Sequence, residues 1–329
     1  MGATSESYGF HGSGLWAVIL GGSSGFGLAT ARRLARAGLH IAIGHRDSPA
    51  ILESRLAPQF ASIREHGVEL LTHNGNLAED DERAALMEAI ERRAGRGGVH
   101  LFLHSIAAGS CKLVTEAPPD GRRREALETL SGVLRDQGAA VSAEALRRAV
   151  DTAFHERGCD ALYTLAESRI PYAEEMLSDD DLARTIALMG YDYLLWGREL
   201  LARGLLAKAA RLVALTSQGS EIAWRGYAAV SAAKATLEAV CRAMAVELGP
   251  HGVHAYLVQA GITDTPAGNA IPNFDLMKAQ ARLRNPLGRL TTTEDVAEAI
   301  YALALPFFNW ANGAVIRVDG GEAVAGSES

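Results

Sequence analysis

The sequence predicts an α/β fold of the doubly wound type, with a seven-stranded parallel sheet and a helical insertion after the fourth strand. Two observations lead to this prediction. Short apolar runs alternate along most of the chain with longer segments of helical periodicity. One long stretch after the fourth run breaks this alternation and has the pattern of helices only. Because parallel neighbours need crossover connections, strands separated by helices imply a parallel sheet covered on both faces.

The predicted strands are apolar runs of four to six residues. The first, LWAVIL, is apolar at every position, as expected for a strand that is buried on both faces. The seven runs are residues 15–20, 40–44, 68–71, 99–104, 210–215, 253–258 and 314–318.

The insertion spans about residues 111–177, where the segments 122–134 and 142–154 have helical patterns. In the second segment, Leu146, Val150 and Phe154 recur every four residues on one face, so we expect this stripe to pack on the domain or to line a channel. Ligands of open α/β sheets bind outside the carboxyl ends of the strands. An insertion that leaves the fourth strand at this edge is therefore predicted to form a roof over the substrate.

Composition and charge narrow the class of protein. A chain of 329 residues with 48% hydrophobic residues fits one large domain, which we expect at residues 15–329 behind a flexible head at residues 1–14. The net charge of −7 argues against a nucleic-acid partner, because neutralising phosphates needs a basic face.

The three cysteines are widely spaced, which predicts a reducing compartment and no metal site. With no signal peptide and no run long enough to span a membrane, we expect a soluble cytoplasmic protein without a membrane partner.

A glycine-rich loop joins the first predicted strand to the helix that follows. In such a loop one glycine permits the tight turn, the next lets the backbone approach a pyrophosphate, and the last lets the helix pack on the strand. The helix N-terminus adds amide donors and a positive dipole for the phosphates. The context of strand, loop and helix predicts a Rossmann-type dinucleotide site. Its residues are Gly21, Gly22, Ser23, Ser24, Gly25, Phe26 and Gly27.

Arg46 follows the second predicted strand, where the 2′-phosphate of NADPH would bind. A carboxylate at this position would instead accept hydrogen bonds from the ribose 2′-hydroxyl of NADH. Arg46 therefore favours NADPH, with Ser23 and Ser24 nearby. Because Asp47 comes next, NADH stays open as the alternative.

These patterns resemble the short-chain dehydrogenase/reductase superfamily over most of the chain outside the head and the insertion. Asn76-Leu77 is similar to the pair that lines the adenine in that superfamily, and Val318-Asp319-Gly320-Gly321 is similar to the end of its last strand. The phrase His104-Ser105-Ile106-Ala107 differs from the usual Asn-Asn-Ala-Gly of the superfamily and resembles the His-Ser-Ile-Ala of enoyl-thioester reductases. The resemblance implies cofactor contacts for Ser105, Ile106 and Ala107, and we assign His104 no proton role.

Tyr227 and Lys234 have the Y-x6-K spacing of enoyl-acyl-carrier-protein reductases, whereas Val230 occupies the tyrosine position of the Y-x3-K ketone reductases. In a helix, seven residues are nearly two turns, so both side chains would lie on one face. Gly226 is placed to let the helix begin at Tyr227. Ser217 stands where these enoyl reductases carry a second tyrosine, and it also matches the carbonyl-polarising serine of classical dehydrogenases. The resemblance implies catalytic roles for Tyr227, Lys234 and Ser217, and Lys234 would also hold the nicotinamide ribose.

The segment Gly261-Ile262-Thr263-Asp264-Thr265 is similar to the loop that meets the nicotinamide carboxamide, with Thr263 in place of the usual isoleucine. Cofactor contacts are therefore implied for Gly261, Thr263 and Thr265.

The resemblance implies NADPH-dependent reduction of the C2–C3 double bond of a trans-2-enoyl thioester, as used in fatty-acid or polyketide synthesis. The thioester would be carried on an acyl carrier protein or coenzyme A. Two alternatives stay open: a carbonyl reductase or alcohol dehydrogenase that uses Ser217, Tyr227 and Lys234, and an NADP-binding protein without catalysis. The last strand resembles one that superfamily members pack across a two-fold axis, so we expect a homodimer or homotetramer.

Overall fold

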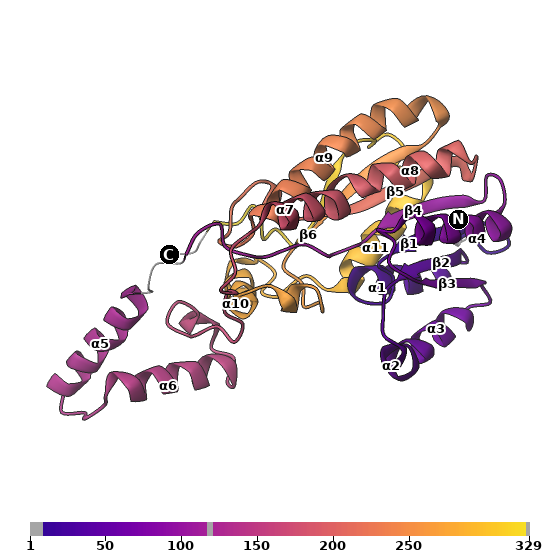
Figure 1. Ribbon diagram of the computed structural model, residues 1–329. Coiled ribbons are helices and arrows are strands. Elements are labelled where there is room, and N and C mark those ends of the chain that lie inside the picture. Colours follow the sequence, from indigo (N-terminus) through magenta and orange to yellow (C-terminus); the bar gives the residue numbers. More distant parts are fainter. Residues whose placement is uncertain (1–8, 117–120, 327–329) are drawn as a thin grey trace.

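A computed structural model describes residues 9–116 and 121–326 of the chain. Within this part, seven parallel strands form one sheet in the order β3-β2-β1-β4-β5-β6-β7 (Figure 1). The predicted fold class is thereby confirmed. The strands are β1 (Trp16–Leu20), β2 (His40–His45), β3 (Leu70–Asn74), β4 (Val99–His104), β5 (Leu206–Thr216), β6 (His254–Ala260) and β7 (Val315–Val318). The order reverses between β1 and β4, and this is the point where doubly wound sheets open a crevice for ligands.

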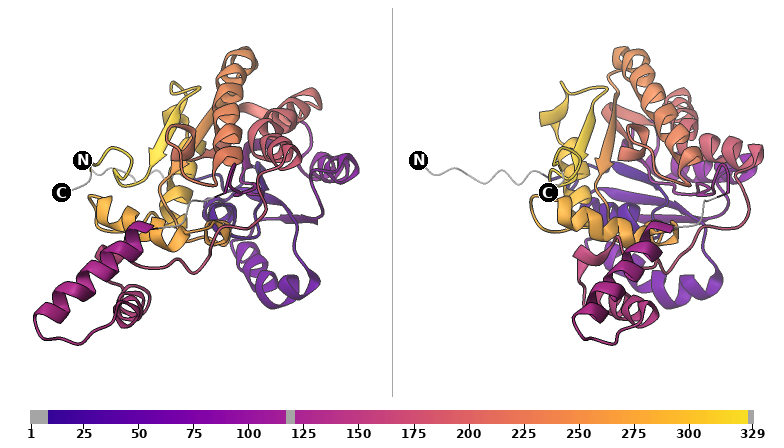
Figure 2. Two further views of the ribbon diagram at one scale, coloured as in Figure 1. Left: turned by 60° about the vertical axis from the view of Figure 1, so that its left-hand side comes forward. Right: turned by 90° about the vertical axis from the view of Figure 1, so that its left-hand side faces the viewer.

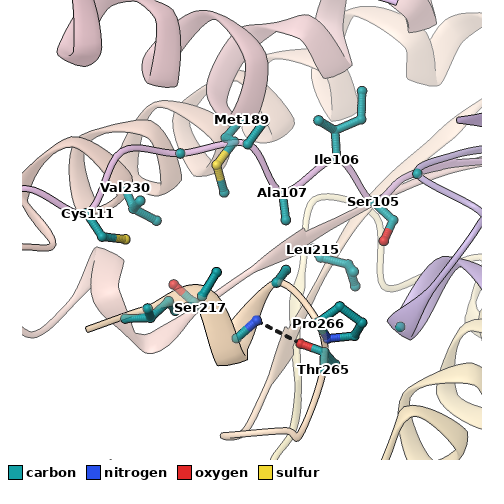
Figure 3. A pocket seen from close by; sticks show the side chains of 18 of the residues that line it. Ser105, Ile106, Ala107, Cys111, Met189, Leu215, Ser217, Val230, Thr265 and Pro266 are labelled. Atoms are coloured by element: carbon teal, nitrogen blue, oxygen red, sulfur yellow. Dashed lines mark hydrogen bonds between the residues drawn. The ribbon is translucent and has the colours of Figure 1, made fainter. Parts of the chain in front are cut away.

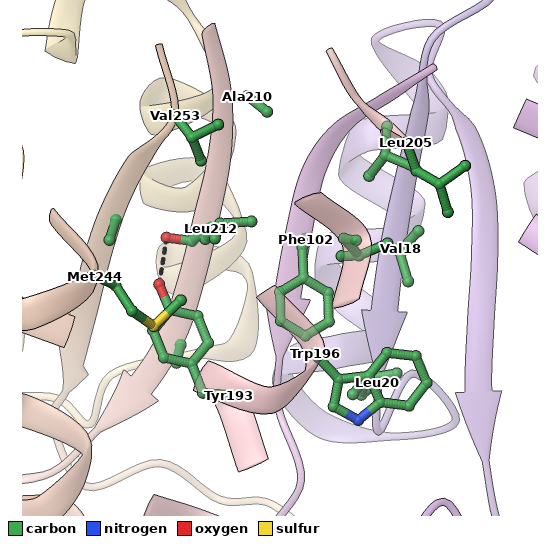
Figure 4. Packing of buried hydrophobic residues seen from close by; sticks show 14 of the residues in the cluster. Val18, Leu20, Phe102, Tyr193, Trp196, Leu205, Ala210, Leu212, Met244 and Val253 are labelled. Carbon is green, nitrogen blue, oxygen red and sulfur yellow. Dashed lines mark hydrogen bonds between the residues drawn. The ribbon is translucent and has the colours of Figure 1, made fainter. Parts of the chain in front are cut away.

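Three helices cover one face of the sheet: α4 (Asp80–Ala94), α8 (Asp192–Ala202) and α9 (Ala228–Leu248). Figure 4 shows the core that they form with the strands, in which Phe102 lies beside Trp196. The Tyr193 hydroxyl donates a hydrogen bond to the Leu212 carbonyl at 2.8 Å, so this buried polar group is satisfied.

The other face is covered by α1 (Gly25–Arg36), α3 (Ala57–Arg64) and α11 (Thr293–Ala304). Their apolar positions form a second core with the opposite side chains of the same strands. Two cores on one sheet explain why the strand runs are apolar at almost every position.

The remaining elements lie in the connections between the strands and the covering helices. A capping box of Ser178 and Asp181 starts α7 (Asp179–Ile186). A π-helical turn, η3 (Ala187–Tyr191), then joins α7 to α8, so the three form one long helical segment. These remaining elements are α2 (Pro49–Ile51), η1 (Leu52–Leu56), η2 (Asp160–Leu162), α7 (Asp179–Ile186), η3 (Ala187–Tyr191), η4 (Gln218–Ser220), η5 (Gly249–His251), η6 (Gly268–Ala270), α10 (Phe274–Arg284) and η7 (Pro306–Phe308).

The insertion after β4 carries two helices, α5 (Gly121–Asp136) and α6 (Ala143–His155). They form an arm that extends away from the sheet (Figures 1 and 2). The predicted apolar stripe of α6 packs inside this arm and against α10: Val150 and Phe154 are buried in a cluster that includes Ala279, and Leu146 packs on it. The stripe therefore packs on the domain and does not line a channel.

Of the head predicted at residues 1–14, residues 1–8 lie outside the described residues. Phe10 packs against the second core, and its N–H donates to the Ala37 carbonyl at 2.6 Å. Among the described residues, no helix combines the length and the hydropathy needed to cross a bilayer.

Candidate active site

A cavity of about 930 Å³ opens at the carboxyl ends of the central strands. Figure 3 shows the segment after β4 on one side of it, facing the loops after β5 and β6 on the other. The predicted site residues that line it are Gly21, Ser23, Ser24, Gly25, Phe26, Arg46, Asn76, Leu77, Ser105, Ile106, Ala107, Ser217, Tyr227, Lys234, Gly261, Thr263 and Thr265. The fold thus brings segments from six parts of the chain to one place.

Gly22 and Gly27 are the predicted site residues that do not line the cavity. A Cβ at Gly27 would stand 2.3 Å from the Gly21 carbonyl oxygen, so only glycine allows the helix to approach the strand this closely. Gly25 has φ of +51°, which is also a backbone conformation that glycine favours. The Ser24 side chain makes no capping hydrogen bond to α1, so it does not occupy the first-turn amides. This cradle fits the pyrophosphate of a dinucleotide.

Arg46 and Asp47, at the end of the cavity expected to bind adenosine, differ in their contacts. Arg46 is exposed and lines the cavity. The Asp47 carboxylate is held by the His45 ring, with Nδ1 to Oδ2 at 3.0 Å, and lies 3.7 Å from the Arg55 guanidinium. Burial lowers the pKa of His45, and the Asp47 carboxylate opposes this shift. The cation therefore faces the cavity, whereas the anion is tied to its neighbours.

His104 and Ser105, neighbours at the end of β4, have different surroundings. Ser105 lines the cavity, and its backbone N–H donates to the Leu20 carbonyl at 2.9 Å. His104 is buried on the other side, with Nε2 3.2 Å from Asp192, which also accepts a hydrogen bond from Arg83 at 2.7 Å. His104 does not line the cavity. These contacts hold the His104 ring beneath the cavity wall and give it a structural role.

Tyr227 stands at the N-cap of α9, directly after Gly226, which has φ of +73°. Burial raises the pKa of the Tyr227 phenol to about 12, and the Ser217 hydroxyl beside it opposes this rise. The Ser217 Oγ is buried and has no hydrogen-bond partner within normal distance. At neutral pH the cavity therefore contains a protonated phenol and an adjacent hydroxyl that is free to bind a substrate oxygen.

Lys234 lies in the second turn of the same helix and is buried. Its Nζ donates to the Leu215 carbonyl at 2.8 Å. Burial lowers the pKa of Lys234 to about 8, and the Glu238 carboxylate acts in the opposite direction. Glu238 is itself bound by the Thr216 hydroxyl at 2.8 Å. This lysine is a cation at pH 7 that titrates far more easily than an exposed one.

Val230 occupies the sequence position of the classical dehydrogenase tyrosine and forms part of the cavity wall. The side chain is 3% exposed and packs with Met189 and Ala233. A Cβ added to Gly109 would stand 2.6 Å from the Val230 Cγ2 and 2.8 Å from the Met189 sulfur, which shows how tightly this wall is packed. Val230 also lines the cavity, so a tyrosine ring at position 230 would have to extend into it.

The loop after β6 is fixed by hydrogen bonds at both ends. The Thr263 hydroxyl donates to the Gly261 carbonyl at 2.9 Å, and the Thr265 hydroxyl accepts from the Gly268 N–H at 3.0 Å (Figure 3). The Ile262 N–H donates to the Glu322 carboxylate at 3.1 Å. Glu322 is 2% exposed and is paired with Arg284 at 2.9 Å, so its buried charge is compensated.

Sequence patterns did not point to several residues that line the cavity. They belong to the ends of the insertion, to the helical turn η3, to the loop before Tyr227 and to the segment after β7. Their neighbours in sequence give no local signal, because only the tertiary fold carries them to the cavity. They include Cys111, Lys112, Tyr172, Met189, Trp224 and Glu322.

The described residues contain no group of three or more His, Cys, Asp or Glu side chains arranged to hold a metal ion. Burial raises the pKa of Cys111, the cysteine that lines the cavity, to about 11, so the thiol is not ionised at neutral pH.

Comparison with known proteins gives two family matches. Residues 137–322 match the family described as enoyl-(acyl carrier protein) reductase, and residues 15–118 match the family described as short chain dehydrogenase. The two matches divide the chain within the insertion.

Individual relatives are of two kinds. L-xylulose reductase of Bos taurus is 28% identical over 250 residues, which are 73% of this chain and 98% of that protein. The enoyl-(acyl-carrier-protein) reductase (NADH) FabI of Escherichia coli is 35% identical over 123 residues, which are 37% of this chain and 47% of that protein. Among solved structures, the Bacillus cereus enoyl-acyl carrier protein reductase with NADP+ and indole naphthyridinone has a TM-score of 0.68 at 21% identity, over 96% of this chain and 98% of that one. This last likeness concerns the fold.

Proposed function

The chain belongs to the enoyl-(acyl-carrier-protein) reductase family of the short-chain dehydrogenase/reductase superfamily, and we propose that it reduces the C2–C3 double bond of a trans-2-enoyl thioester with NADPH. It is an NAD(P)H-dependent oxidoreductase. The carrier of the thioester is an acyl carrier protein or coenzyme A.

One observation carries the proposal: Tyr227 and Lys234 line the same cavity at the Y-x6-K spacing, while Val230 fills the Y-x3-K position. The neighbouring wall is apolar, which suits an acyl chain. Its residues include Met189, Trp224, Ile271, Phe274 and Met277.

When bound, the nicotinamide cofactor supplies the hydride. The residues expected to hold it are those of the glycine loop, Arg46, Lys234 and the loop after β6. As hydride adds to Cβ, negative charge would develop on the thioester oxygen, and the Tyr227 hydroxyl would donate a hydrogen bond to that oxygen. A proton from Tyr227 or from water would then add to Cα and complete the reduction. Because the phenol stays protonated at neutral pH, it can act as this donor throughout the physiological range. The Ser217 hydroxyl is close enough to Tyr227 to serve as a second donor.

A second candidate is reduction of a carbonyl group. The free Ser217 hydroxyl beside Tyr227 and the likeness to L-xylulose reductase favour it. In that reaction the two hydroxyls would bind the carbonyl oxygen and Tyr227 would give it a proton.

Assays of the purified protein separate the two candidates. NADPH oxidation is measured with crotonyl and longer 2-enoyl thioesters and, in parallel, with ketones and L-xylulose. The proposal predicts a higher kcat/KM with an enoyl thioester. Turnover of carbonyl substrates alone would assign the second function, and tight NADPH binding without any turnover would assign neither.

We predict that NADPH is preferred over NADH by about tenfold or more in kcat/KM, which corresponds to one charge-assisted contact of about 1.4 kcal/mol. Arg46 faces the cavity, whereas Asp47 is tied to His45 and Arg55. Arg46→Ala should remove most of this preference. Arg64→Ala, at an exposed position of α3, is the control. An unchanged NADPH/NADH ratio in Arg46→Ala would remove the basis for this cofactor choice.

We also propose a homodimer or homotetramer in the cytoplasm. Strand β7 lies at the edge of the sheet, Trp310 in the loop before it is fully exposed, and Val246 in α9 is 75% exposed. Exposed apolar side chains of this size mark interaction surfaces in soluble proteins. Light scattering at micromolar concentration should give a mass of two or four chains, and Trp310→Glu should lower it. A monomer mass for the unmodified protein would refute the proposed assembly.

The three cysteines are free thiols, which suits a reducing compartment.

A further inference from the structure

The two ends of the insertion return to the cavity although its helical arm extends away. Cys111 and Lys112 line the cavity on the outgoing side. On the returning side, the residues 168–173, called here the strap, contribute Ile170, Pro171, Tyr172 and Ala173 to the lining. The insertion therefore takes part in the site through its ends.

The strap is held on one side by the start of α10. The Asp275 carboxylate accepts hydrogen bonds from the Ser168 hydroxyl at 2.7 Å and from the Arg169 N–H at 2.9 Å. The Ile170 carbonyl accepts from the Asn273 N–H at 2.9 Å. These contacts leave Asp275 itself outside the cavity lining.

On its other side, the strap touches the turn that leads into Tyr227. The Tyr172 hydroxyl donates to the Arg225 carbonyl at 3.1 Å. The Tyr172 ring lies on Gly226, where an added Cβ would stand 2.7 Å from the ring carbon Cε1. Within the turn, the Tyr227 N–H donates to the Trp224 carbonyl at 3.2 Å. One side chain thus fixes the two residues that precede the phenol donor.

We infer that Tyr172, supplied by the insertion, is a positioning residue for Tyr227 and part of the wall that receives the acyl chain. The inference rests on the proposed function, because it takes Tyr227 as the donor to substrate. Tyr227 sits at the N-cap without a side-chain cap of its own, so its direction depends on the backbone of Arg225 and Gly226. The Tyr172 hydroxyl and ring act on these two residues separately, which makes their roles separable by substitution.

Tyr172→Phe removes the hydroxyl and keeps the ring on Gly226. We expect kcat to fall by about three- to tenfold, the scale of one neutral hydrogen bond, with NADPH affinity within about twofold of wild type. Tyr172→Ala also removes the wall, so KM for long acyl chains should rise more than KM for short ones. Tyr163→Phe, in the same insertion but outside the cavity lining, is the matched control and should leave kcat unchanged.

The decisive measurement is a double-mutant cycle with Tyr227→Phe. If Tyr172 acts through Tyr227, Tyr172→Phe should have no further effect on kcat in the Tyr227→Phe background. Multiplicative effects of the two substitutions would show that Tyr172 acts independently and would overturn the inference. The cycle is run on whichever substrate class the wild-type protein reduces, so failure of the proposed enoyl activity is a separate result.

Hydrogen–deuterium exchange of the segment 221–230 in the NADPH-bound protein supplies a readout that needs no substrate. Tyr172→Phe and Asp275→Ala should both speed exchange there, the second by releasing the strap without altering Tyr172. Unchanged exchange in both variants would contradict the inference even if the wild-type protein turned over neither substrate class.

Discussion

Replacing Tyr227 by phenylalanine is expected to lower kcat for enoyl-thioester reduction by about 10² or more, with little change in NADPH affinity. The size follows from the loss of a preorganised donor to a developing oxyanion. The affinity should persist because the dinucleotide cradle and Lys234 are untouched, and the phenylalanine ring can keep the edge-on contact of Tyr227 with Trp224. Steady-state kinetics and titration of the nucleotide fluorescence measure the two quantities.

Tyr191→Phe is the control for this substitution, because Tyr191 is 41% exposed in η3 and does not line the cavity. Full enoyl reductase activity in Tyr227→Phe would show that another group stabilises the oxyanion. Ser217→Ala would then be the next variant, since its hydroxyl is the nearest candidate donor. A loss of NADPH affinity as large as the loss of kcat would instead indicate that the substitution disturbs the cofactor site.

Moving the tyrosine to the classical position would change more than the location of its hydroxyl. The spacing predicts that Val230→Tyr with Tyr227→Phe would move the hydroxyl toward the geometry of a ketone reductase. Val230 packs beside Gly109 and Met189 but also lines the cavity, so the new ring would have to extend into the cavity. The double variant would therefore change the shape of the cavity as well as the position of the hydroxyl.

The sheet and the dinucleotide cradle could be predicted from the sequence because both depend on local patterns. A strand buried on both faces must be apolar throughout, and the tight approach of Gly27 to Gly21 admits only glycine. The strand predicted at residues 68–71 begins two residues later, at Leu70. The error is small because burial of Val68 and pairing of the strand do not start at the same residue.

The substrate end of the site was not predictable in the same way. Tyr172 lies 55 positions before Tyr227, and Glu322 lies 60 positions after Ile262, yet each contacts that neighbourhood in the fold. No periodicity or short motif encodes such pairings. The predicted role of the insertion as a roof stays a proposal. The insertion contributes the strap, Cys111 and Lys112 to the cavity lining, whereas the α6 stripe packs on α10.

Replacing Lys234 is expected to change NADPH binding and kcat while leaving the stability of the folded protein nearly unchanged. Lys234→Met should weaken NADPH binding by about 10- to 10²-fold, the scale of hydrogen bonds to a charged group, and should lower kcat as well. The folded apo protein should nevertheless keep its stability to within about 1 kcal/mol. Removing the buried cation relieves its desolvation cost, whereas losing its hydrogen bond to the Leu215 carbonyl costs stability, and each effect is about 1–3 kcal/mol.

The pH dependence supplies the stricter test of the same residue. The pKa of Lys234 is about 8 in the folded protein, below its value of about 10.4 in an unfolded chain. Between these values the unfolded state binds more protons, so the wild-type apo protein should gain stability relative to Lys234→Met as pH rises from about 8 to about 10. Over the same rise NADPH affinity of the wild type should fall, because the cation that holds the ribose is lost. Lys208→Met, at an exposed position of β5, should change neither profile. Parallel pH profiles of Tm and of NADPH affinity in wild type and Lys234→Met would contradict the assignment of this lysine as the titrating cofactor ligand.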